Sequence, residues 1–507
     1  MTTIWSASPV LSNRIKVMAS AELCNLTLSE AQQALKENRT TSEALTQACL
    51  AQIDKYDDVI GAFLHVDRKN ALNQAQASDA RRQTNKTLGP IDGIPIGLKD
   101  NILAVGTPTT AASRSLENYD STYNATVTQK LLNAGAVILG KLNLDEFAMG
   151  SSNENSAYKT CKNPWNTQKA PGGSSGGAAA AVAAGMCFGA LGTDTGGSIR
   201  QPASFCGVTG LKPTYGRVSR FGVVAYGSSL DQVGPLARDV KGTSLLYEAI
   251  SGFDPRDATS LNRPIEPIQT SPNLKGLRIG LPKEFNAHEG LSQEVQQILN
   301  STQAKLSELG ATIREVSLPH TSYAIATYYI VATAEAASNL ARYDGIRYGP
   351  RKGQDKGLES LYAQTRGQLL GKEVKRRILL GNYVLSAGYY DAYYLKALKA
   401  RRRIADDFAT AFQSVDLILC PTAPTPAFGI GEKTSDPLQM YLSDIFTISC
   451  NLAGIPGLSL NAGFSQEGLP VGMQLLGPSF SEHRLLETAQ CLEASLGLLN
   501  QRPSLQN

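Results

Sequence analysis

The chain has 507 residues, of which 42% are hydrophobic and 18% are charged, and its formal net charge is only +4. This composition is typical of a globular protein, and so small a net charge gives no independent case for a nucleic-acid groove or a membrane surface. No apolar run reaches the roughly 18 residues that a transmembrane helix needs, so we expect no membrane span.

The N-terminus differs in composition from the rest of the chain. The first 20 residues contain no acidic residue, two basic ones (Arg14 and Lys16) and several serines. We interpret residues 1–20 as a disordered extension, with Met18 as an alternative start, and residues 21–507 as one domain. A cytoplasmic protein is the simplest expectation, and a plastid or mitochondrial location is the alternative if this segment is a transit peptide.

Eight cysteines are scattered along the chain. None forms a C-x-x-C pair or lies at ligand spacing from a histidine, so we expect no metal site. A chain of this length can bury a core without disulfides, so free thiols in a reducing compartment are the simplest interpretation.

Helical patterns come first along the chain. Thr27 and Glu30 have the spacing of a capping box, and Leu45, Cys49 and Ile53 recur at helical spacing. These signals predict two successive amphipathic helices before residue 60.

The pattern then changes to a strand. Residues 94–98 alternate between branched aliphatic and small side chains, which predicts a buried strand that ends at Lys99. A helix at residues 127–133, a glycine at Gly135 and an apolar strand at residues 136–139 follow.

The same helix–glycine–strand unit recurs at residues 295–316, where Gly310 separates helix from strand. Residues 328–409 are rich in Tyr, Arg and Ala and are predicted to be helical. Further apolar strands are predicted at residues 416–420, 457–460 and 471–476. Repeated units of this kind predict an α/β fold in which helices cover a sheet, as one large domain.

Two clusters of glycine and serine lie in the middle of the chain, at residues 171–177 (PGGSSGG) and 192–200 (GTDTGGSIR). The Ala-rich run at residues 178–191 between them predicts a buried helix. Glycine-rich turns of this kind expose N–H groups and bring side chains close to a ligand. The alternative is a pair of turns that only pack against helices.

Familiar motifs do not account for these clusters. Neither has the lysine of a P-loop or the pattern of a dinucleotide fingerprint. The first cluster fits the G-x-S-x-G pattern of α/β-hydrolases. In those enzymes the motif follows an apolar strand, whereas the residues before this cluster, 162–171, are mostly polar and contain two prolines.

A nucleophilic serine in these clusters would need a base. None of the four histidines lies near either cluster, although distance along the sequence does not exclude them. Lysine is the other choice, provided that burial lowers its pKa toward neutrality. Lys99 follows the apolar residues 94–98, which would supply that burial, whereas a lysine at a strand end is otherwise usually solvated.

These segments resemble the amidase signature family. Residues 93–100 (GIPIGLKD) and both glycine–serine clusters match its motifs, and the spacing between them agrees. The resemblance extends over about residues 25–490. It implies an α/β/α sandwich in which helices cover a large mixed central sheet.

The resemblance also implies a serine-hydrolase centre. Ser198 would be the acylated nucleophile, Ser174, in a cis peptide after Gly173, would relay its proton, and Lys99 would be the final base, neutral at rest. No metal or cofactor is needed in this chain. The backbone N–H groups expected in the oxyanion hole are those of Thr195, Gly196, Gly197 and Ser198.

Within the family, four segments are similar to the glutaminase subunits of tRNA-dependent amidotransferases, at residues 144–152, 212–222, 371–377 and 388–394. This similarity implies glutamine as the substrate. Arg377 would clamp its α-carboxylate, Asp444 would bind its α-ammonium, and Tyr328 would line the pocket. Without the similarity, the simplest interpretation is surface ion pairing for Arg377 and Asp444 and core packing for Tyr328.

The similarity further implies a heterotrimer. A kinase-like B subunit would use ATP and Mg, together with the released ammonia, to amidate mischarged Glu-tRNA(Gln), Asp-tRNA(Asn) or both, and a small C subunit would complete the assembly. The tRNA would bind mainly through the partner. One alternative is a stand-alone amidase acting on a small or fatty amide, which needs neither Arg377 nor Asp444. The other is a non-enzymatic scaffold, which would not need Lys99, Ser174 and Ser198.

Overall fold

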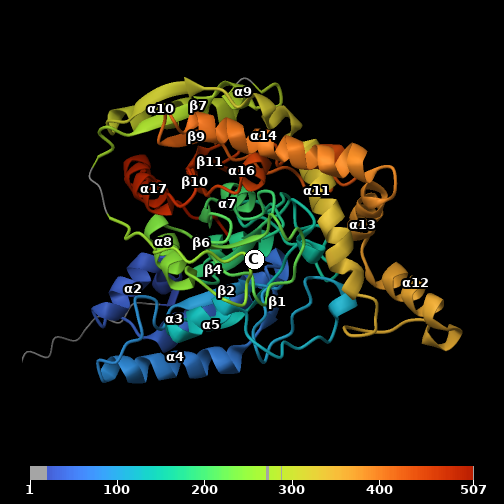
Figure 1. Cartoon of the computed structure of the whole chain (residues 1–507). Helices are drawn as coiled ribbons and strands as arrows, with labels where there is room; N and C mark the ends of the chain where they lie inside the picture. The colour runs from blue at the N-terminus through green and yellow to red at the C-terminus, as the bar shows by residue number, and fades with distance from the viewer. Residues whose placement is uncertain (1–19, 270–272, 287, 506–507) are drawn as a thin grey trace, which may run out of the picture.

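The computed structural model describes residues 20–269, 273–286 and 288–505. Of the expected extension at residues 1–20, only Ser20 lies among the described residues, where it begins helix α1. Figure 1 shows a central sheet with helices on both sides of it. No helix of the described residues is both long enough and apolar enough to cross a membrane.

The sheet has eleven strands in the order β1-β3-β2-β4-β6-β5-β10-β11-β9-β7-β8. β2 runs parallel to β3 and β4, β7 runs parallel to β8 and β9, and the other neighbouring pairs are antiparallel. The large mixed sheet predicted for this chain is therefore confirmed. The strands are Phe63–Val66 (β1), Pro95–Lys99 (β2), Val137–Leu142 (β3), Gly189–Asp194 (β4), Thr209–Lys212 (β5), Gln232–Ala237 (β6), Arg278–Pro282 (β7), Thr312–Val316 (β8), Leu417–Pro421 (β9), Gly457–Phe464 (β10) and Pro470–Leu476 (β11).

Helices are the other main element, and several of them lie in the long segment predicted to be helical. A π-helical turn, Tyr390–Leu395, lies within that segment. The α-helices are Ser20–Asn25 (α1), Leu28–Lys36 (α2), Ser42–Ile60 (α3), Arg68–Gln83 (α4), Thr126–Asn133 (α5), Gly176–Ala183 (α6), Arg200–Cys206 (α7), Val240–Ile250 (α8), Lys283–Asn286 (α9), Gln293–Glu308 (α10), Ala324–Asn339 (α11), Leu358–Leu369 (α12), Lys372–Leu385 (α13), Lys396–Ala411 (α14), Pro437–Leu442 (α15), Ile448–Ala453 (α16) and Glu482–Leu496 (α17).

Local signals fix the first long helices. The Thr27 hydroxyl accepts a hydrogen bond from the backbone N–H of Glu30, whose carboxylate accepts one from the N–H of Thr27, so α2 begins with the predicted capping box. Leu45, Cys49 and Ile53 are buried along one side of α3. Both predictions are confirmed.

The Ala-rich helix is shorter than predicted. It ends at Ala183, where Gly185 takes a φ of 70°, and Leu191 lies in β4 instead. The composition misled the prediction because β4 is buried on both faces and therefore contains small and apolar residues without alternation. This helix–strand unit joins the two glycine–serine clusters.

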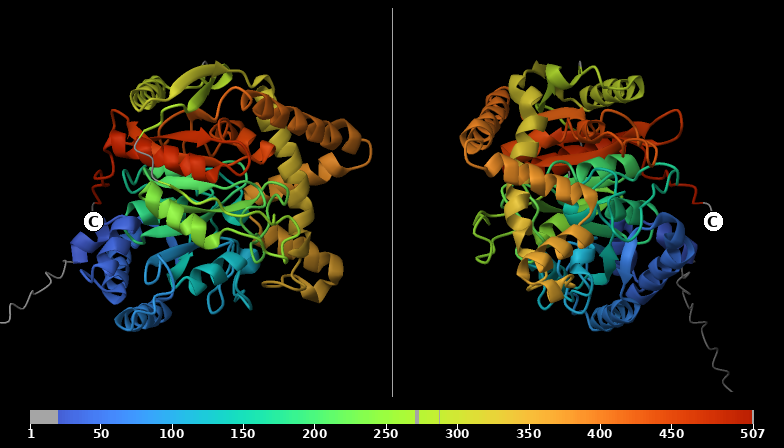
Figure 2. Two further views of the ribbon diagram at one scale, coloured as in Figure 1. Left: turned by 60° about the vertical axis from the view of Figure 1, so that its left-hand side comes forward. Right: turned by 90° about the vertical axis from the view of Figure 1, so that its right-hand side faces the viewer.

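β4 also shows how helices cover both faces of the sheet. A Cβ atom added at Gly189 would meet Leu246 of α8, whereas one added at Gly192 would meet Ile199 beside α7 and the hydroxyl of Ser175. Because side chains alternate between faces along a strand, α8 and the segment from Ser175 to α7 lie on opposite faces. Figure 2 shows α8 and α17 side by side on the first face, and contacts between them agree.

A layer of helices covers the second face beyond α7. α11, α13 and α14 pack together, and α11 and α14 contact α16 (Figures 1 and 2). This layer brings the helical segment at residues 324–411 over the ends of the central strands.

Candidate active site

Lys99 ends β2, and its side chain is fully buried. Its Nζ lies 2.7 Å from Ser174 Oγ, 2.8 Å from Ser175 Oγ and 2.9 Å from Thr193 Oγ1. Burial lowers the pKa of the amine to about 7. Three buried carboxylates oppose this shift, those of Asp145, Asp194 and Asp231. A lysine with such a pKa can accept a proton near neutral pH.

The two serines lie where the glycine–serine clusters meet. The peptide between Gly173 and Ser174 is cis, as the resemblance implied. The N–H of Ser175 donates a hydrogen bond to the carbonyl oxygen of Ser198 at 3.1 Å, so the clusters are bonded to each other. Ser174 is fully buried, whereas Ser198 is 8% exposed. Ser198 is therefore the residue of the predicted triad that an incoming substrate meets first.

The loop after β4 has several open backbone amides. Among the described residues, the N–H groups of Thr195, Gly196 and Ser198 have no protein acceptor. The structure differs from the prediction at Gly197, whose N–H donates to Asp194 Oδ1 at 2.8 Å. Three of the four expected oxyanion donors thus remain open.

Gly197 instead allows a close approach between segments. Its φ is 140°, and a Cβ atom at this position would lie 2.2 Å from Thr447 Oγ1. The Thr447 hydroxyl donates to the carbonyl oxygen of Gly196 at 2.6 Å. The absence of a side chain at Gly197 therefore lets Thr447, which precedes α16, bind the backbone of the loop directly.

Asp194 and Arg200 anchor this loop. Arg200 Nε donates to Asp194 Oδ2 at 3.0 Å, and both side chains are fully buried. Arg200 also donates to the carbonyl oxygen of Thr447, to Asn451 Oδ1 and to Gln474 Oε1. The sequence contained a signal for this pair, because both residues lie in the second cluster, but not for the three distant acceptors.

Arg377, on α13, is 4% exposed. Its Nε donates to Glu373 Oε1 at 2.8 Å and its Nη1 donates to Tyr226 Oη at 2.8 Å. A guanidinium has five N–H donors, and the Nη2 group has no acceptor among the described residues. Arg377 therefore keeps donors free for an anionic ligand.

Asp444 shows the complementary feature. The Ser151 hydroxyl donates to its Oδ2, whereas its buried Oδ1 has no partner among the described residues. Burial raises the pKa of Asp444 to about 7, opposed by the hydrogen bond from Ser151 and the charge of Arg377. Because buried carboxylate oxygens are normally hydrogen-bonded, this oxygen is suited to a cationic ligand.

Tyr328 connects these residues to the loop after β4. Its ring is buried, and a Cβ atom at Gly196 would lie 2.7 Å from the ring's Cζ. The Tyr328 hydroxyl lies close to Tyr226 and, through it, to Arg377. The structure thus gathers the predicted pocket residues beside the predicted oxyanion hole.

Several residues of this site were not predicted. Ser175, Thr193, Ser151 and Glu373 all lie inside segments that sequence analysis singled out, so a signal existed. Tyr226 lies outside these segments, and only the folding of the chain brings it into contact with Arg377.

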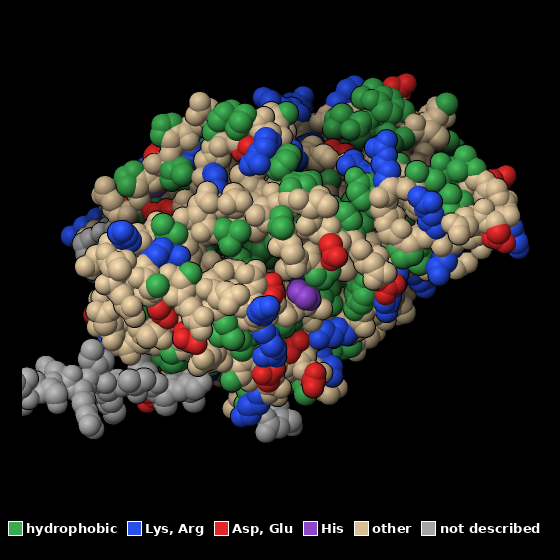
Figure 3. Space-filling view, turned by 90° about the horizontal axis from the view of Figure 1, so that it is seen from below, with side chains coloured by type: hydrophobic (Ala, Val, Ile, Leu, Met, Phe, Trp, Pro, Cys, Tyr) green, Lys and Arg blue, Asp and Glu red, His purple; other side chains and the backbone are tan. Residues whose placement is uncertain are grey.

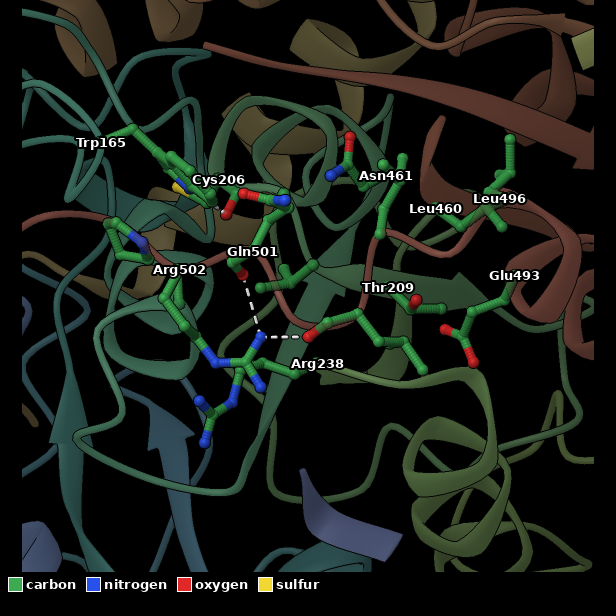
Figure 4. Close-up of a pocket in the computed structure, with 16 residues that line it drawn as sticks. Trp165, Cys206, Thr209, Arg238, Leu460, Asn461, Glu493, Leu496, Gln501 and Arg502 are labelled. Atoms are coloured by element: carbon green, nitrogen blue, oxygen red, sulfur yellow. Dashed lines mark hydrogen bonds between the residues drawn. The ribbon is translucent and has the colours of Figure 1, made fainter. Parts of the chain in front are cut away.

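A separate pocket of about 30 Å³ lies near the chain ends (Figure 4). Trp165, Arg238, Glu493 and Arg502 are among its lining residues, and none of the predicted site residues is. Arg238 and Arg502 donate to backbone carbonyls of residues 24–26. These contacts fasten the C-terminal segment to the first helices, so we assign this pocket a structural role.

The described residues contain no group of three or more His, Cys, Asp or Glu side chains that could hold a metal ion. All eight cysteines are buried and free.

Comparisons with known proteins give a family match and similar relatives. The sequence matches the Amidase family over residues 44–486. It is 54% identical to the A subunit of the glutamyl-tRNA(Gln) amidotransferase of Moorella thermoacetica, over 96% of this chain and 99% of the relative. The identity to the protein of the same name from Microcystis aeruginosa is 55%, over 94% of this chain and 98% of the relative.

Two solved structures of amidase-type proteins align with nearly the whole chain. The A subunit of the glutamyl-tRNA(Gln) amidotransferase of Thermotoga maritima aligns with a TM-score of 0.77 at 40% identity and covers 98% of this chain and 100% of its own. The native peptide amidase of Stenotrophomonas maltophilia aligns with a TM-score of 0.80 at 29% identity, over 95% of this chain and 99% of its own.

Proposed function

This chain belongs to the amidase family, and we propose that it hydrolyses glutamine as the glutaminase component of a tRNA-dependent amidotransferase. The observation that carries this proposal is a basic and an acidic side chain, each with an open hydrogen-bonding position, beside the candidate triad. Arg377 has free donors and Asp444 has an unpartnered carboxylate oxygen. A zwitterionic amino acid matches both, whereas a simple or fatty amide matches neither.

The proposed reaction begins with Ser198. Its Oγ attacks the side-chain carboxamide carbon of glutamine while its proton passes to Ser174, and Ser174 passes its own proton to Lys99. The carbonyl oxygen becomes an oxyanion, which the N–H groups of Thr195, Gly196 and Ser198 stabilise. Each such donor typically lowers the barrier by about 3–4 kcal/mol.

The same proton then serves the leaving group. Lys99 returns it through Ser174 to the amide nitrogen, the C–N bond breaks, and ammonia leaves a glutamyl ester on Ser198. Water attacks this ester with Lys99 again taking the proton, the bond from the acyl carbon to Ser198 Oγ breaks, the proton returns through Ser174 to Ser198, and glutamate departs. The neutral form of Lys99 is therefore needed at the start of both half-reactions.

The proposed partners follow from the relatives' designation as subunits. We infer a kinase-like B subunit that binds ATP and Mg and a small C subunit, with Glu-tRNA(Gln) as the favoured acceptor of the ammonia. Basic and acidic side chains are interspersed on the face in Figure 3. This mixed surface agrees with a tRNA that binds mainly through the partner.

A substrate panel tests the proposal. We expect hydrolysis of glutamine to exceed that of butyramide and oleamide, and Arg377→Ala to raise the KM for glutamine about 10- to 100-fold, the effect of losing a charged hydrogen bond. Labelling of Ser198 by a fluorophosphonate, which does not use Arg377, should be unchanged. Arg403→Ala, on the exposed side of α14, is the matched control.

Two outcomes would contradict the proposal. Unchanged glutamine hydrolysis in Arg377→Ala, or faster hydrolysis of a simple or fatty amide, would favour a stand-alone amidase. Labelling that persists in Ser198→Ala would show that Ser198 is not the nucleophile.

A further inference from the structure

We propose that Glu373 and Tyr441 are positioning residues that fix Arg377 relative to Asp444. By holding this separation, they select amides that carry both an α-carboxylate and an α-ammonium. The inference rests on the proposed glutamine pocket and adds residues to it.

Glu373 fixes the orientation of the guanidinium. It lies four residues before Arg377 on α13 and accepts the Nε hydrogen bond at 2.8 Å, an arrangement favourable on a helix. Because Glu373 holds Nε and Tyr226 holds Nη1, the plane of the guanidinium is fixed while Nη2 keeps its donors. An arginine held in this way loses less side-chain entropy when it binds a carboxylate.

Three tyrosine rings confine the same guanidinium. Arg377 Cζ lies 5.2 Å from the ring centroid of Tyr329, 5.5 Å from that of Tyr441 and 5.6 Å from that of Tyr226. The Tyr329 and Tyr441 rings are stacked, with centroids 3.8 Å apart. Cation–π contacts with all three rings disfavour rotation of Arg377 out of the site.

Tyr441 also links Arg377 to the segment that carries Asp444. The Tyr441 hydroxyl donates to Glu373 Oε1 at 2.9 Å. The backbone N–H of Asp444 donates to the Tyr441 carbonyl oxygen at 3.2 Å, so both residues belong to one turn. The Tyr441–Glu373 bond therefore ties the turn of Asp444 to the helix of Arg377.

Ser151 and Thr447 hold Asp444 itself, but the helix that contains Tyr441 has few other contacts. α15, which contains Tyr441, buries none of its residues, and Leu438 and Leu442 on it are exposed. The contacts of Tyr441 are thus a substantial part of what holds α15 against α13. Without them, the distance between the cationic and anionic groups of the pocket would vary.

The test uses Tyr441→Phe, which removes the hydroxyl and keeps the ring, and Glu373→Gln, which keeps the shape and removes the charge, in the full-length chain. We expect the KM for glutamine to rise about tenfold in each, because Tyr441→Phe loses one hydrogen bond and Glu373→Gln weakens two by removing the charge of their acceptor, with kcat changed less than about twofold. The rate at which a fluorophosphonate labels Ser198 should stay unchanged. Tyr362→Phe, on the exposed helix α12, is the matched control.

The outcomes separate this inference from the proposed function. If Arg377→Ala leaves the KM for glutamine unchanged, the glutamine pocket itself fails. If Arg377→Ala raises the KM but Tyr441→Phe and Glu373→Gln do not, the pocket stands and the positioning role is wrong. An equal loss of probe labelling would also overturn the inference, because it would indicate a collapsed site.

Discussion

At the scale of single residues, burial sets the chemistry of this site. The Lys99 amine is surrounded by three hydroxyl groups and has no carboxylate in direct contact, so desolvation dominates and its pKa falls to about 7. Lys141 offers a contrast in the neighbouring strand. Burial lowers the pKa of its amine as well, but the amine pairs with Asp100 at 2.9 Å, which opposes that shift and makes it a structural lysine. The difference between the two lies in their partners rather than in their burial.

The pKa of Lys99 predicts a pH dependence of the reaction. Because the amine must be neutral to take a proton, kcat for glutamine should rise with pH through about 7 and level off above it. Lys99→Ala should lower kcat about 100- to 10,000-fold, whereas Lys86→Ala, on an exposed loop, should have no effect. Steady-state kinetics from acid to alkaline pH measures both. A flat profile across this range would refute the assignment of Lys99 as the base.

At the scale of elements, the glycines of the second cluster let a loop pass close to its neighbours. Gly196 lies against the ring of Tyr328 and Gly197 lies against Thr447. The N–H of Gly197 is bonded to Asp194, so the loop keeps a fixed shape while its other amides stay open. A side chain at either glycine would displace these amides.

Gly197→Ala tests this role of the loop. Its Cβ would lie 2.2 Å from Thr447 Oγ1, so the loop must move and the oxyanion donors with it. We expect kcat to fall at least about 100-fold, the effect of losing an oxyanion donor, with the circular dichroism spectrum unchanged. Gly468→Ala is the control, because Gly468 also has a positive φ but open space around it. Near-normal kcat in Gly197→Ala would contradict the close packing described here.

At the scale of the whole molecule, Arg200 joins distant parts of the fold. It connects Asp194 at the end of β4 with Gln474 in β11 and with Asn451 in α16, all of them buried. These strands lie on different sides of β5, β6 and β10 in the sheet order. The residue therefore couples the loop after β4 to the second half of the sheet.

Removing this side chain should weaken the whole fold. Arg200→Ala leaves the carboxylate of Asp194 buried without its cation, which typically costs about 3–5 kcal/mol. Urea unfolding should show the midpoint shifted to lower denaturant. Arg402→Ala removes an arginine that is 80% exposed and should change stability by less than about 0.5 kcal/mol. A stability loss in Arg200→Ala no larger than in this control would refute the coupling.

Much of the fold could be predicted because its signals are local. The capping box of Thr27 and Glu30, the apolar stripe of α3 and the strand ending at Lys99 depend on spacing along a few residues. β4 was misassigned because a strand buried on both faces has no alternating pattern to distinguish it from a buried helix.

The sequence by itself determined the family, the α/β class and the candidate site residues, because motifs and periodicity are properties of short segments. Only the tertiary structure decided which of them meet. It paired Ser151 with Asp444 and Tyr441 with Glu373, and it left Asp444 Oδ1 open while engaging the N–H of Gly197. Burial and hydrogen-bond partners depend on contacts between distant segments, and a linear pattern does not specify those contacts.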